Sequence, residues 1–336
     1  MSGQFHTSCL PTGPVDLSRV AVVIPYYHGK DFIQSCLRSI LANGIRASRI
    51  YIVENSVRRG ELASLAVEFP EVHVLEAPPR LGFGKACNLG ARTAISDGAV
   101  MVAILNQDLV VGDQCLTRLV RSLYADPRLA ITAPLNFSHD FREMEGFYVK
   151  HYLSECPSLV KDAIEGNLRT TYAVPKVMGS SFVVRADVVE RLGLFDEIYF
   201  MYCEDDDLCR RYIAAGLGLA LVSDAAVGHA HSHTNQDRDE SIDVQERESR
   251  QVFLLKSSER SFLQNWIRVQ RFNFLDYFKL VSSLRVGLLF SALGSDLRVL
   301  AKTSRIRTLR RREMELTAAY RQEASVQRPR GIEKVA

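Results

Sequence analysis

Short apolar runs rich in β-branched residues alternate with helix-like stretches over the first third of the chain. The runs predict strands, and apolar residues at helical spacing lie between them; the strands are Val20–Pro25, Ile50–Val53, Val72–Leu75 and Val100–Leu105, and the helices are Phe32–Leu41, Leu62–Phe69 and Cys87–Ile95. Strands that alternate with helices in this way form a mostly parallel sheet with helices on both faces. The pattern therefore predicts an α/β fold, which continues with Ser181–Arg185 (strand), Ala186–Leu192 and Asp205–Ala215 (helices) and Leu219–Val222 (strand).

The composition and the cysteines narrow the class of protein. A chain of 336 residues with 47% hydrophobic and 24% charged residues is neither disordered nor collagen-like. Its seven cysteines are odd in number and include no Cys-x-x-Cys pair, which argues against a disulfide framework or a zinc ribbon. No basic start followed by an apolar run occurs between Met1 and Val20, as a secretory signal would require. We therefore expect a cytoplasmic protein.

The second half of the chain is organised differently. Residues Phe137 to Pro175 have turn formers and scattered aromatics without a clean period, and we expect a loop-rich insert near the site. Asp237–Arg250 is a mixed charged run that we expect to be exposed. The remainder reads as helical and basic. These features divide the chain into an N-terminal segment (1–19), a catalytic domain (20–235) and a basic helical C-terminal extension (236–336).

Polar clusters follow three of the predicted strands. They are Tyr26-Tyr27, Glu54-Asn55-Ser56 and Asn106-Gln107-Asp108. In parallel sheets ligands bind beyond the carboxyl ends of the strands, so these clusters indicate a binding site. A carboxylate such as Asp108 can hold Mg²⁺ or Mn²⁺ against a diphosphate, although a lone Asp after a strand is more often a turn former or a helix cap.

Four consecutive carboxylates, Glu204 to Asp207, stand just before an apolar-periodic helix. Like charges this close raise one another's pKa, which is unfavourable unless a cation or a proton-transfer role offsets it. Acids in the first turn of a helix are also favoured as caps, and that interpretation would account for one or two of them. We expect at least one to be functional.

Three histidines alternate in the segment Gly228 to His233, and they would share one face of an extended backbone. Histidine with aspartate suits a divalent ion, but zinc sites usually draw their ligands from separated elements. We therefore expect His229 to be a ligand, and His231 and His233 to be loop residues.

A glycine-rich turn enters the helix after the third strand, from Arg80 to Gly90. Such a turn brings backbone close to a ligand, and Arg80 and Lys85 carry charge suited to phosphate. The turn is neither a Walker loop nor a dinucleotide-binding Gly-x-Gly-x-x-Gly. The alternative is a tight strand-to-helix turn with basic side chains on the surface.

Taken together and in this order, the segments resemble the inverting family 2 glycosyltransferases with the GT-A fold, and the bacterial rhamnosyltransferase-like branch in particular. The matching segments span about Val20 to His233; they are VVIPYY at 22–27, IVENS at 52–56, RLGFGKACNLG at 80–90, LNQD at 105–108, the long run from Gly179 to Arg211, and AAVGHAH at 225–231. The run from Gly179 to Arg211 is the most specific of these.

The resemblance implies a role for each matching residue. Asp205 is the catalytic base, Asp108 and His229 are the metal ligands for Mg²⁺ or Mn²⁺, and Gly179, Ser180 and Glu204 lie on the acceptor side. The donor-binding residues implied are Pro25, Tyr26, Tyr27, Glu54, Arg80, Gly82, Lys85, Asn88, Asn106, Gln107 and Asp108. This sequence departs from the family in two places: Asn106 replaces the first carboxylate of the family's DxD motif, and the loop after Glu54 is shortened.

The resemblance also implies a reaction and partners. The donor would be dTDP-rhamnose or a UDP-sugar such as UDP-galactofuranose, and the acceptor a surface polysaccharide or a lipid-linked glycan. A catalytically silent nucleotide-sugar-binding protein and a nucleotidyltransferase are the alternatives. A nucleic-acid-binding protein is disfavoured, because no base-stacking aromatics are interleaved with the arginines of 305–312.

The charge of the chain is concentrated near its end. Residues 256–312 carry a net charge of +10, which leaves −7 for the rest of the chain. Phe274, Phe278, Val281, Leu284 and Leu288 recur at helical spacing among these cations, and Leu280–Leu293 is too short to span a bilayer. Two interpretations of 274–312 stay open: a helix on an anionic membrane, on the inner face of the plasma membrane, or helices packed on the catalytic domain or on a second copy of the chain.

Overall fold

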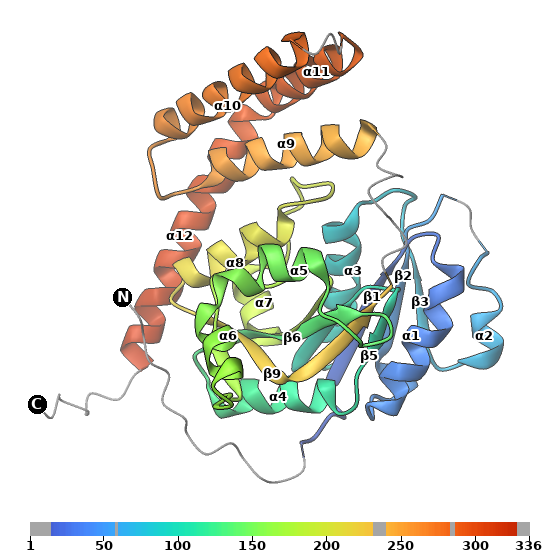
Figure 1. The fold of residues 1–336 in the computed structure, drawn as a ribbon. Helices are drawn as coiled ribbons and strands as arrows, with labels where there is room; N and C mark the ends of the chain where they lie inside the picture. The colour runs from blue at the N-terminus through green and yellow to red at the C-terminus, as the bar shows by residue number, and fades with distance from the viewer. Residues whose placement is uncertain (1–14, 58–59, 231–239, 283–285, 328–336) are drawn as a thin grey trace, which may run out of the picture.

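The structure is a computed structural model that describes residues 15–57, 60–230, 240–282 and 286–327 (Figure 1). In this part of the chain, nine strands form one mixed sheet in the order β3-β2-β1-β4-β8-β6-β9-β5, with β7 paired to β9. The strands are β1 (Val20–Tyr26), β2 (Ile50–Glu54), β3 (His73–Glu76), β4 (Met101–Leu105), β5 (Leu109–Val111), β6 (Leu129–Ser138), β7 (Thr171–Ala173), β8 (Ser181–Arg185) and β9 (Gly218–His229).

The sequence predicted the four parallel strands β1 to β4, together with β8 and part of β9. Strands β3, β2, β1 and β4 run parallel, β8 pairs antiparallel with both β4 and β6, and β6 pairs parallel with β9. Strands β5 and β6 were not predicted, and β9 extends seven residues beyond the predicted end at Val222. This extension matters for the site, because it makes His229 the last residue of a strand.

Helices cover both faces of the sheet (Figure 1). Those of the sheet-containing part are α1 (Lys30–Ala42), α2 (Leu65–Glu68), α3 (Phe83–Ser96), α4 (Cys115–Ala125), α5 (Gly146–His151), α6 (Pro157–Ile164), α7 (Ala186–Leu192) and α8 (Glu204–Ala214), with short 3₁₀ turns at Ala47–Arg49 and Leu153–Glu155. Helix α3 begins four residues before the predicted start at Cys87, directly after Gly82, and α2 is shorter than predicted.

Alternation along the strands produces two apolar cores. Val22 of β1 faces a core shared with α1 and α4, whereas its neighbour Val23 faces a core shared with α3 and α8. Successive side chains of a strand point to opposite faces, so a continuous apolar run is what a sheet buried on both sides requires. Strands β2 and β4 are buried throughout and β1 is nearly so, whereas Val74 of the predicted strand Val72–Leu75 is 40% exposed.

The expectation of a loop-rich insert at Phe137–Pro175 was wrong. This stretch contains the end of β6, helices α5 and α6, and β7. The helices are short and cross one edge of the fold, so only part of each is buried. Such helices show too few turns for an apolar period to stand out in the sequence.

Four helices follow the sheet: α9 (Glu240–Lys256), α10 (Phe262–Ser282), α11 (Val286–Ala301) and α12 (Thr303–Gln327). Helix α9 lies between the sheet-containing part and the pair α10 and α11, and α12 runs down the side of the molecule (Figure 1). The expectation that Asp237–Arg250 is exposed was wrong for the part that is described, because Arg247 and Ser249 are buried. The described residues include no helix that is both long enough and apolar enough to cross a membrane.

Candidate active site

The carboxyl ends of β1, β2 and β4 meet at one edge of the sheet, as predicted. Glu54, the last residue of β2, is in register with Tyr26 of β1. The side-chain amide of Gln107, just after β4, donates to the Tyr27 carbonyl and accepts from the Tyr27 N–H, both at 2.8 Å. Gly29 is required here, since a Cβ would lie 2.2 Å from the Gln107 amide. Gln107 therefore holds two strand ends together.

The residues predicted to line the nucleoside pocket differ in exposure. Pro25 is half-buried and Tyr27 is 43% exposed, so both can meet a ligand. The ring of Tyr26 is fully buried and its hydroxyl donates to Glu61 at 2.8 Å, which leaves the backbone of Tyr26 as the part that could line the predicted pocket. Glu54 is buried, and its Oε1 has no hydrogen-bond partner among the described residues.

The glycine-rich turn ties β2 to the loop before α8. The backbone N–H of Arg80 donates to the Asn55 carbonyl at 3.1 Å, and the N–H of Leu81 donates to Asn55 Oδ1 at 2.6 Å. Gly82 has a φ of +96°, and a Cβ there would lie 2.5 Å from the Phe200 carbonyl oxygen. Only glycine meets both demands. The turn and the Phe200 loop are therefore in direct backbone contact.

Helix α3 begins against the same loop. The N–H of Phe83 donates to the Phe200 carbonyl at 3.2 Å. The amide of Asn88 donates to the Phe195 carbonyl at 2.9 Å and accepts from the Phe195 N–H at 3.0 Å. Asn88 thus holds the backbone before α8, and both of these hydrogen bonds are made to protein backbone. Lys85 is half-buried and Arg80 is exposed.

His229 lies between two carboxylates. The pairing of β5 with β9 sets Leu109 opposite His229, which brings Nε2 of His229 to 3.4 Å from Oδ1 of Asp108. On the other side, Nδ1 lies 3.4 Å from Oε2 of Glu145, at the start of α5. Burial alone would lower the pKa of His229, but the interactions with Asp108 and Glu145 outweigh it and raise the pKa to about 9. A metal ion bound through Nε2 would require the neutral imidazole and would therefore displace this proton.

Asp205 stands at the first turn of α8 and is held from outside its helix. Its Oδ2 accepts from the Gly179 N–H at 3.0 Å and from the Tyr152 hydroxyl at 3.2 Å. Its Oδ1 accepts from the N–H of Asp206 at 2.9 Å. A Cβ at Gly179 would lie 3.0 Å from Cβ of Asp205, so glycine allows this close approach. Three donors thus orient one carboxylate.

The four consecutive carboxylates have different surroundings. Burial, together with the charge of Asp205, raises the pKa of Glu204 to about 8 and that of Asp206 to about 6. Oε2 of Glu204 is buried without a hydrogen-bond partner among the described residues. Burial would also raise the pKa of Asp207, but Lys256 and Arg210 outweigh it and hold that pKa well below its usual range. Asp207 is therefore an ion-paired anchor, whereas Glu204, Asp205 and Asp206 form a separate cluster of acids.

A backbone contact connects Asp205 to Asp108. The residues that follow Gly179 lead into β8, and the Ser180 carbonyl accepts from the Asn106 N–H at 2.9 Å. Ser180 Oγ and Asn106 Oδ1 are both buried without a partner in the described part of the chain. Asp108 follows Asn106 by two residues and faces His229. The structure thus brings the three separated segments that carry Asp205, Asp108 and His229 to one edge of the sheet.

The donor atoms at this edge suit a divalent ion only in part. Among the described residues, no group of three or more His, Cys, Asp or Glu side chains is arranged to hold a metal. Asp108 and His229 supply one carboxylate and one imidazole, and Mg²⁺ sites commonly use one or two protein ligands together with substrate phosphates. The arrangement fits a metal site that the substrate completes. His231 and His233 lie outside the described residues.

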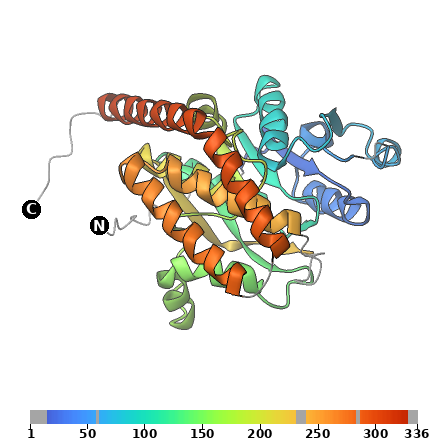
Figure 2. The same cartoon turned by 90° about the horizontal axis from the view of Figure 1, so that it is seen from above.

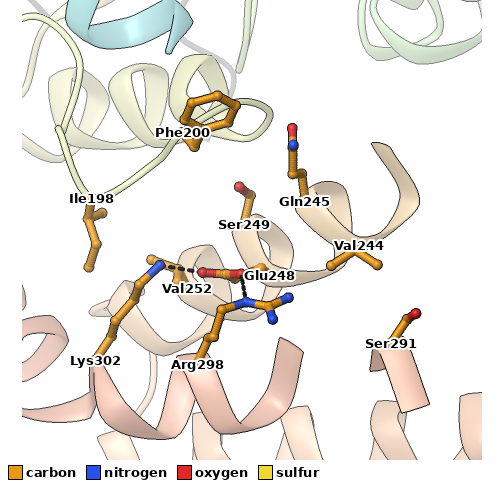
Figure 3. A pocket seen from close by; sticks show the side chains of 10 residues that line it. All are labelled: Ile198, Phe200, Val244, Gln245, Glu248, Ser249, Val252, Ser291, Arg298 and Lys302. Carbon is orange, nitrogen blue, oxygen red and sulfur yellow. Dashed lines mark hydrogen bonds and ion pairs between the residues drawn. The ribbon is translucent and has the colours of Figure 1, made fainter. Parts of the chain in front are cut away.

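A cavity of about 630 Å³ lies between the Phe200 loop and helices α9 and α11 (Figure 3). Glu248 projects into it from α9 and pairs with Arg298 at 2.9 Å and with Lys302. Ser249 donates to the Met201 carbonyl at 2.7 Å, so the loop is anchored to α9. No pattern in the sequence predicted this cavity, and Asp205 does not line it.

Two residues of the site were missed by the sequence reasoning. Tyr152 and Glu145 both fall in the stretch that was expected to be loop-rich. Tyr148 and Tyr152 are four residues apart and their rings stack 5.9 Å apart, and this spacing was the available signal.

Comparison with known proteins defines the family. The family model described as glycosyl transferase family 2 matches residues 21–193, which include β1, the glycine-rich turn and the Asn106–Asp108 segment. The chain belongs to glycosyl transferase family 2. The matched residues end before Asp205 and His229, so the placement of these two rests on the geometry described above.

Relatives of this family 2 glycosyltransferase include rhamnosyltransferases. It is 24% identical over 169 residues to dTDP-rhamnosyl transferase RfbF of Shigella flexneri, covering 48% of this chain and 53% of that protein. It is 25% identical over 238 residues to N-acetylglucosaminyl-diphospho-decaprenol L-rhamnosyltransferase of Mycobacterium tuberculosis, covering 62% of this chain and 75% of that protein. The chain thus spans about half the length of the Shigella relative.

Solved structures share the fold at low identity. A mannosyltransferase from Pyrobaculum calidifontis, in complex with GDP-Man and Mn²⁺, is 15% identical with a TM-score of 0.55, covering 96% of this chain and 90% of that one. GalNAc-T7 with UDP, GalNAc and Mn²⁺ is 15% identical with a TM-score of 0.51, covering 73% of this chain and 52% of that one. The GT-A fold expected from the sequence is thus confirmed.

Proposed function

We propose that this family 2 glycosyltransferase moves one sugar from a nucleotide diphosphate to an acceptor hydroxyl, with inversion of the anomeric centre. Rhamnose is the sugar that we propose first. One observation carries the proposal: the Gly179–Ser180 backbone contacts both the Asp205 carboxylate and the segment that leads to Asp108 and His229. A carboxylate on one side and a charge-stabilising pair on the other are what a single in-line displacement needs.

Asp205 accepts the proton of the acceptor hydroxyl as that oxygen attacks the anomeric carbon. Tyr152 and the Gly179 N–H bind Oδ2 and keep the carboxylate oriented. A general base must be held within hydrogen-bond reach of the proton that it accepts, and these two donors fix its position. Glu204, with its pKa raised to about 8, stays neutral at physiological pH and adds no competing charge.

The other half of the site receives the diphosphate. Asp108 and His229 would hold a Mg²⁺ or Mn²⁺ ion, which would neutralise charge on the leaving diphosphate when bound. Arg80 and Lys85 flank the glycine-rich turn and are suited to the phosphates. Pro25, Tyr27 and the unpartnered Oε1 of Glu54 are suited to the nucleoside.

The donor, the acceptor and the compartment belong to the same proposal. The two rhamnosyltransferase relatives support dTDP-rhamnose ahead of a UDP-sugar, and the Mycobacterium relative's name supports a lipid-linked acceptor. The six described cysteines are free thiols and five of them are buried, which fits the cytoplasm. We propose no nucleic-acid partner.

The test separates chemistry from binding. Purified Asp205→Asn should transfer sugar about 10²–10⁴-fold more slowly than the wild type, because the general base is lost. Calorimetry should give nearly the same donor affinity for both. The donor is chosen beforehand by thermal stabilisation with dTDP-rhamnose, UDP-sugars and GDP-sugars, each with and without Mn²⁺.

Asp187→Asn is the matched control, because Asp187 is an exposed acid in the first turn of α7. It should keep wild-type activity. A variant Asp205→Asn with full activity would refute the assignment of the base. Donor binding with neither hydrolysis nor transfer to any acceptor would instead favour a catalytically silent nucleotide-sugar-binding protein.

A further inference from the structure

The outward faces of α10 and α11 are strongly apolar although no residue of the described part of the chain covers them. Phe274 and Phe278 of α10 are 69% and 68% exposed, and Phe290 and Leu297 of α11 are 69% and 66% exposed. Two further exposed positions extend the face at helical spacing: Ile267 and Leu293. Figure 2 looks down on this end of the molecule, where the two helices lie across the top. We call these six residues the outer face.

The inward faces of the same helices already account for their packing. Arg247 of α9 binds Asn273 at 2.8 Å and Asp276 at 2.6 Å on α10, and Asp296 at 3.2 Å on α11. Val269 lies in the apolar cluster shared with α9. Packing on the rest of the protein therefore does not explain the outer face, and exposed apolar patches of this kind mark interaction sites.

The charges beside the outer face have one sign. Asp276 is the sole acid in the sequence of α10, and Asp296 is the sole acid in α11. Both are directed inward to Arg247. In contrast, Arg268 and Arg271 are exposed and line a groove of about 450 Å³ on α10.

A second groove, of about 590 Å³, lies where α10, α11 and α12 meet. It is lined by Leu263, Trp266 and Leu300, and the guanidinium of Arg307 lies 4.4 Å from the ring centre of Phe262 at its rim. Both grooves thus combine apolar side chains with arginine. A lipid bilayer with anionic headgroups presents the complementary surface, apolar below and negative above.

We infer that the outer face lies in the plane of an anionic lipid bilayer. A second copy of this chain would be the other apolar partner, but a twofold contact through the same face would set Arg268 and Arg271 of one copy against the arginines of the other. Since neither helix can span a membrane, the contact is interfacial. The inference concerns binding alone and does not rest on the proposed function.

The test is vesicle flotation of the full chain. The protein should float with vesicles of phosphatidylcholine and phosphatidylglycerol, and poorly with phosphatidylcholine alone. High salt should weaken flotation because the arginines act through screened charge. Flotation that is equal with neutral and anionic vesicles would overturn the inference.

Two pairs of substitutions divide the apolar and the ionic contributions. Phe274→Gln with Phe278→Gln should lower the vesicle partition coefficient about tenfold or more. Arg268→Gln with Arg271→Gln should lower it about fivefold for each arginine at low salt. All four side chains are exposed, so the variants should fold, and circular dichroism verifies this.

The matched control is Val67→Gln with Ile164→Gln, since these side chains are 86% and 83% exposed outside the C-terminal helices. The control should float like the wild type. Wild-type flotation by the phenylalanine pair would overturn the inference. So would a wild-type dimer that binds no vesicles and dissociates in the phenylalanine pair, because a second copy would then cover the face.

Discussion

Asp205 and its neighbour Tyr152 lie 53 positions apart, so the hydroxyl acts on the carboxylate only through the fold. Tyr152→Phe removes one of three donors to Asp205 and leaves the ring in place. The carboxylate then loses one of the hydrogen bonds that orient it, so proton transfer from the acceptor hydroxyl becomes slower. At neutral pH, kcat should fall about tenfold with little change in donor KM.

Steady-state kinetics over a pH series measures this, with Tyr124→Phe as the control because Tyr124 is an exposed tyrosine on α4. A kcat for Tyr152→Phe that is no lower than that of Tyr124→Phe would contradict the orienting role of Tyr152.

Glu204 makes stability depend on pH. Its pKa is raised from 4.5 to about 8 by burial first and by Asp205 second. Between these values the folded chain holds a proton that the unfolded chain has released, so the free energy of unfolding falls as pH rises through this window. Glu204→Gln carries no such proton. It should be more stable than the wild type at about pH 9 by on the order of a few kcal/mol, and less distinct from it at about pH 5.

Urea denaturation at the two pH values measures the difference, and Glu190→Gln, at an exposed position, provides the control. A stability difference that is the same at both pH values would contradict the explanation.

For single residues, the sequence predicted which side chains are candidates for the chemistry but not which groups they contact. The run Glu204 to Asp207 was visible as a functional cluster, and Asp108 and His229 were singled out. Adjacent residues of a helix point about a quarter turn apart, so one cluster supplies both a site and an anchor. Whether an acid belongs to the site or to the anchor depends on its contacts with α9 and α12, and no local sequence pattern predicts those contacts.

Among the elements, α8, α9 and α12 meet at one buried cation. Lys256 of α9 has no exposed surface, and its Nζ lies 2.5 Å from Asp196, 2.9 Å from Asp207 and 3.3 Å from Glu313. Arg210 and Arg211 bind Asp207 from α8 itself. Lys256→Met should lower the free energy of unfolding by about 3–5 kcal/mol, because buried carboxylates lose their shared partner.

Chemical denaturation measures this loss. Lys161→Met removes an exposed lysine that pairs with Glu165 four residues on, and it should change stability by less than about 0.5 kcal/mol. Equal effects for the two variants would mean that the buried cluster contributes no more than a surface pair.

Strands were predicted well where they are buried on both faces of the sheet. The continuous apolar runs of β1, β2 and β4 left no ambiguity. Strand β9 was cut short at Val222 because Ser223 and Asp224 interrupt its apolar pattern, and these two are partly or fully exposed at the sheet edge. Strand β6 was overlooked because no motif drew attention to Leu129–Ser138.

For the whole molecule, the C-terminal helices and the sheet should unfold together. An apolar cluster that includes Tyr199, Leu255 and Ile306 joins them, in addition to Lys256. Trp266, the single tryptophan of the sequence, lies on α10 and packs against this cluster, so its fluorescence reports on the helices alone. The urea transition seen by tryptophan fluorescence should coincide with that seen by far-ultraviolet circular dichroism.

Coincident midpoints would indicate one cooperative unit. A fluorescence midpoint at lower urea than the dichroism midpoint would contradict this expectation, because the helices would then unfold on their own. The sequence predicted that the extension is helical and basic, but its amphipathic pattern has two apolar faces on α10. One face packs inward and the other does not, and a sequence pattern cannot assign which.

Asp205 and Asp207 lie only two positions apart on α8, and this has a practical consequence for genetic screens. Loss-of-function mutations should be recovered at Lys256, Asp196 and Glu313, although none of these would touch a sugar or a nucleotide. A survey that scores only loss of activity would wrongly assign these positions to the catalytic centre. Measuring the abundance of each mutant protein alongside its activity would show that these positions affect stability and not catalysis.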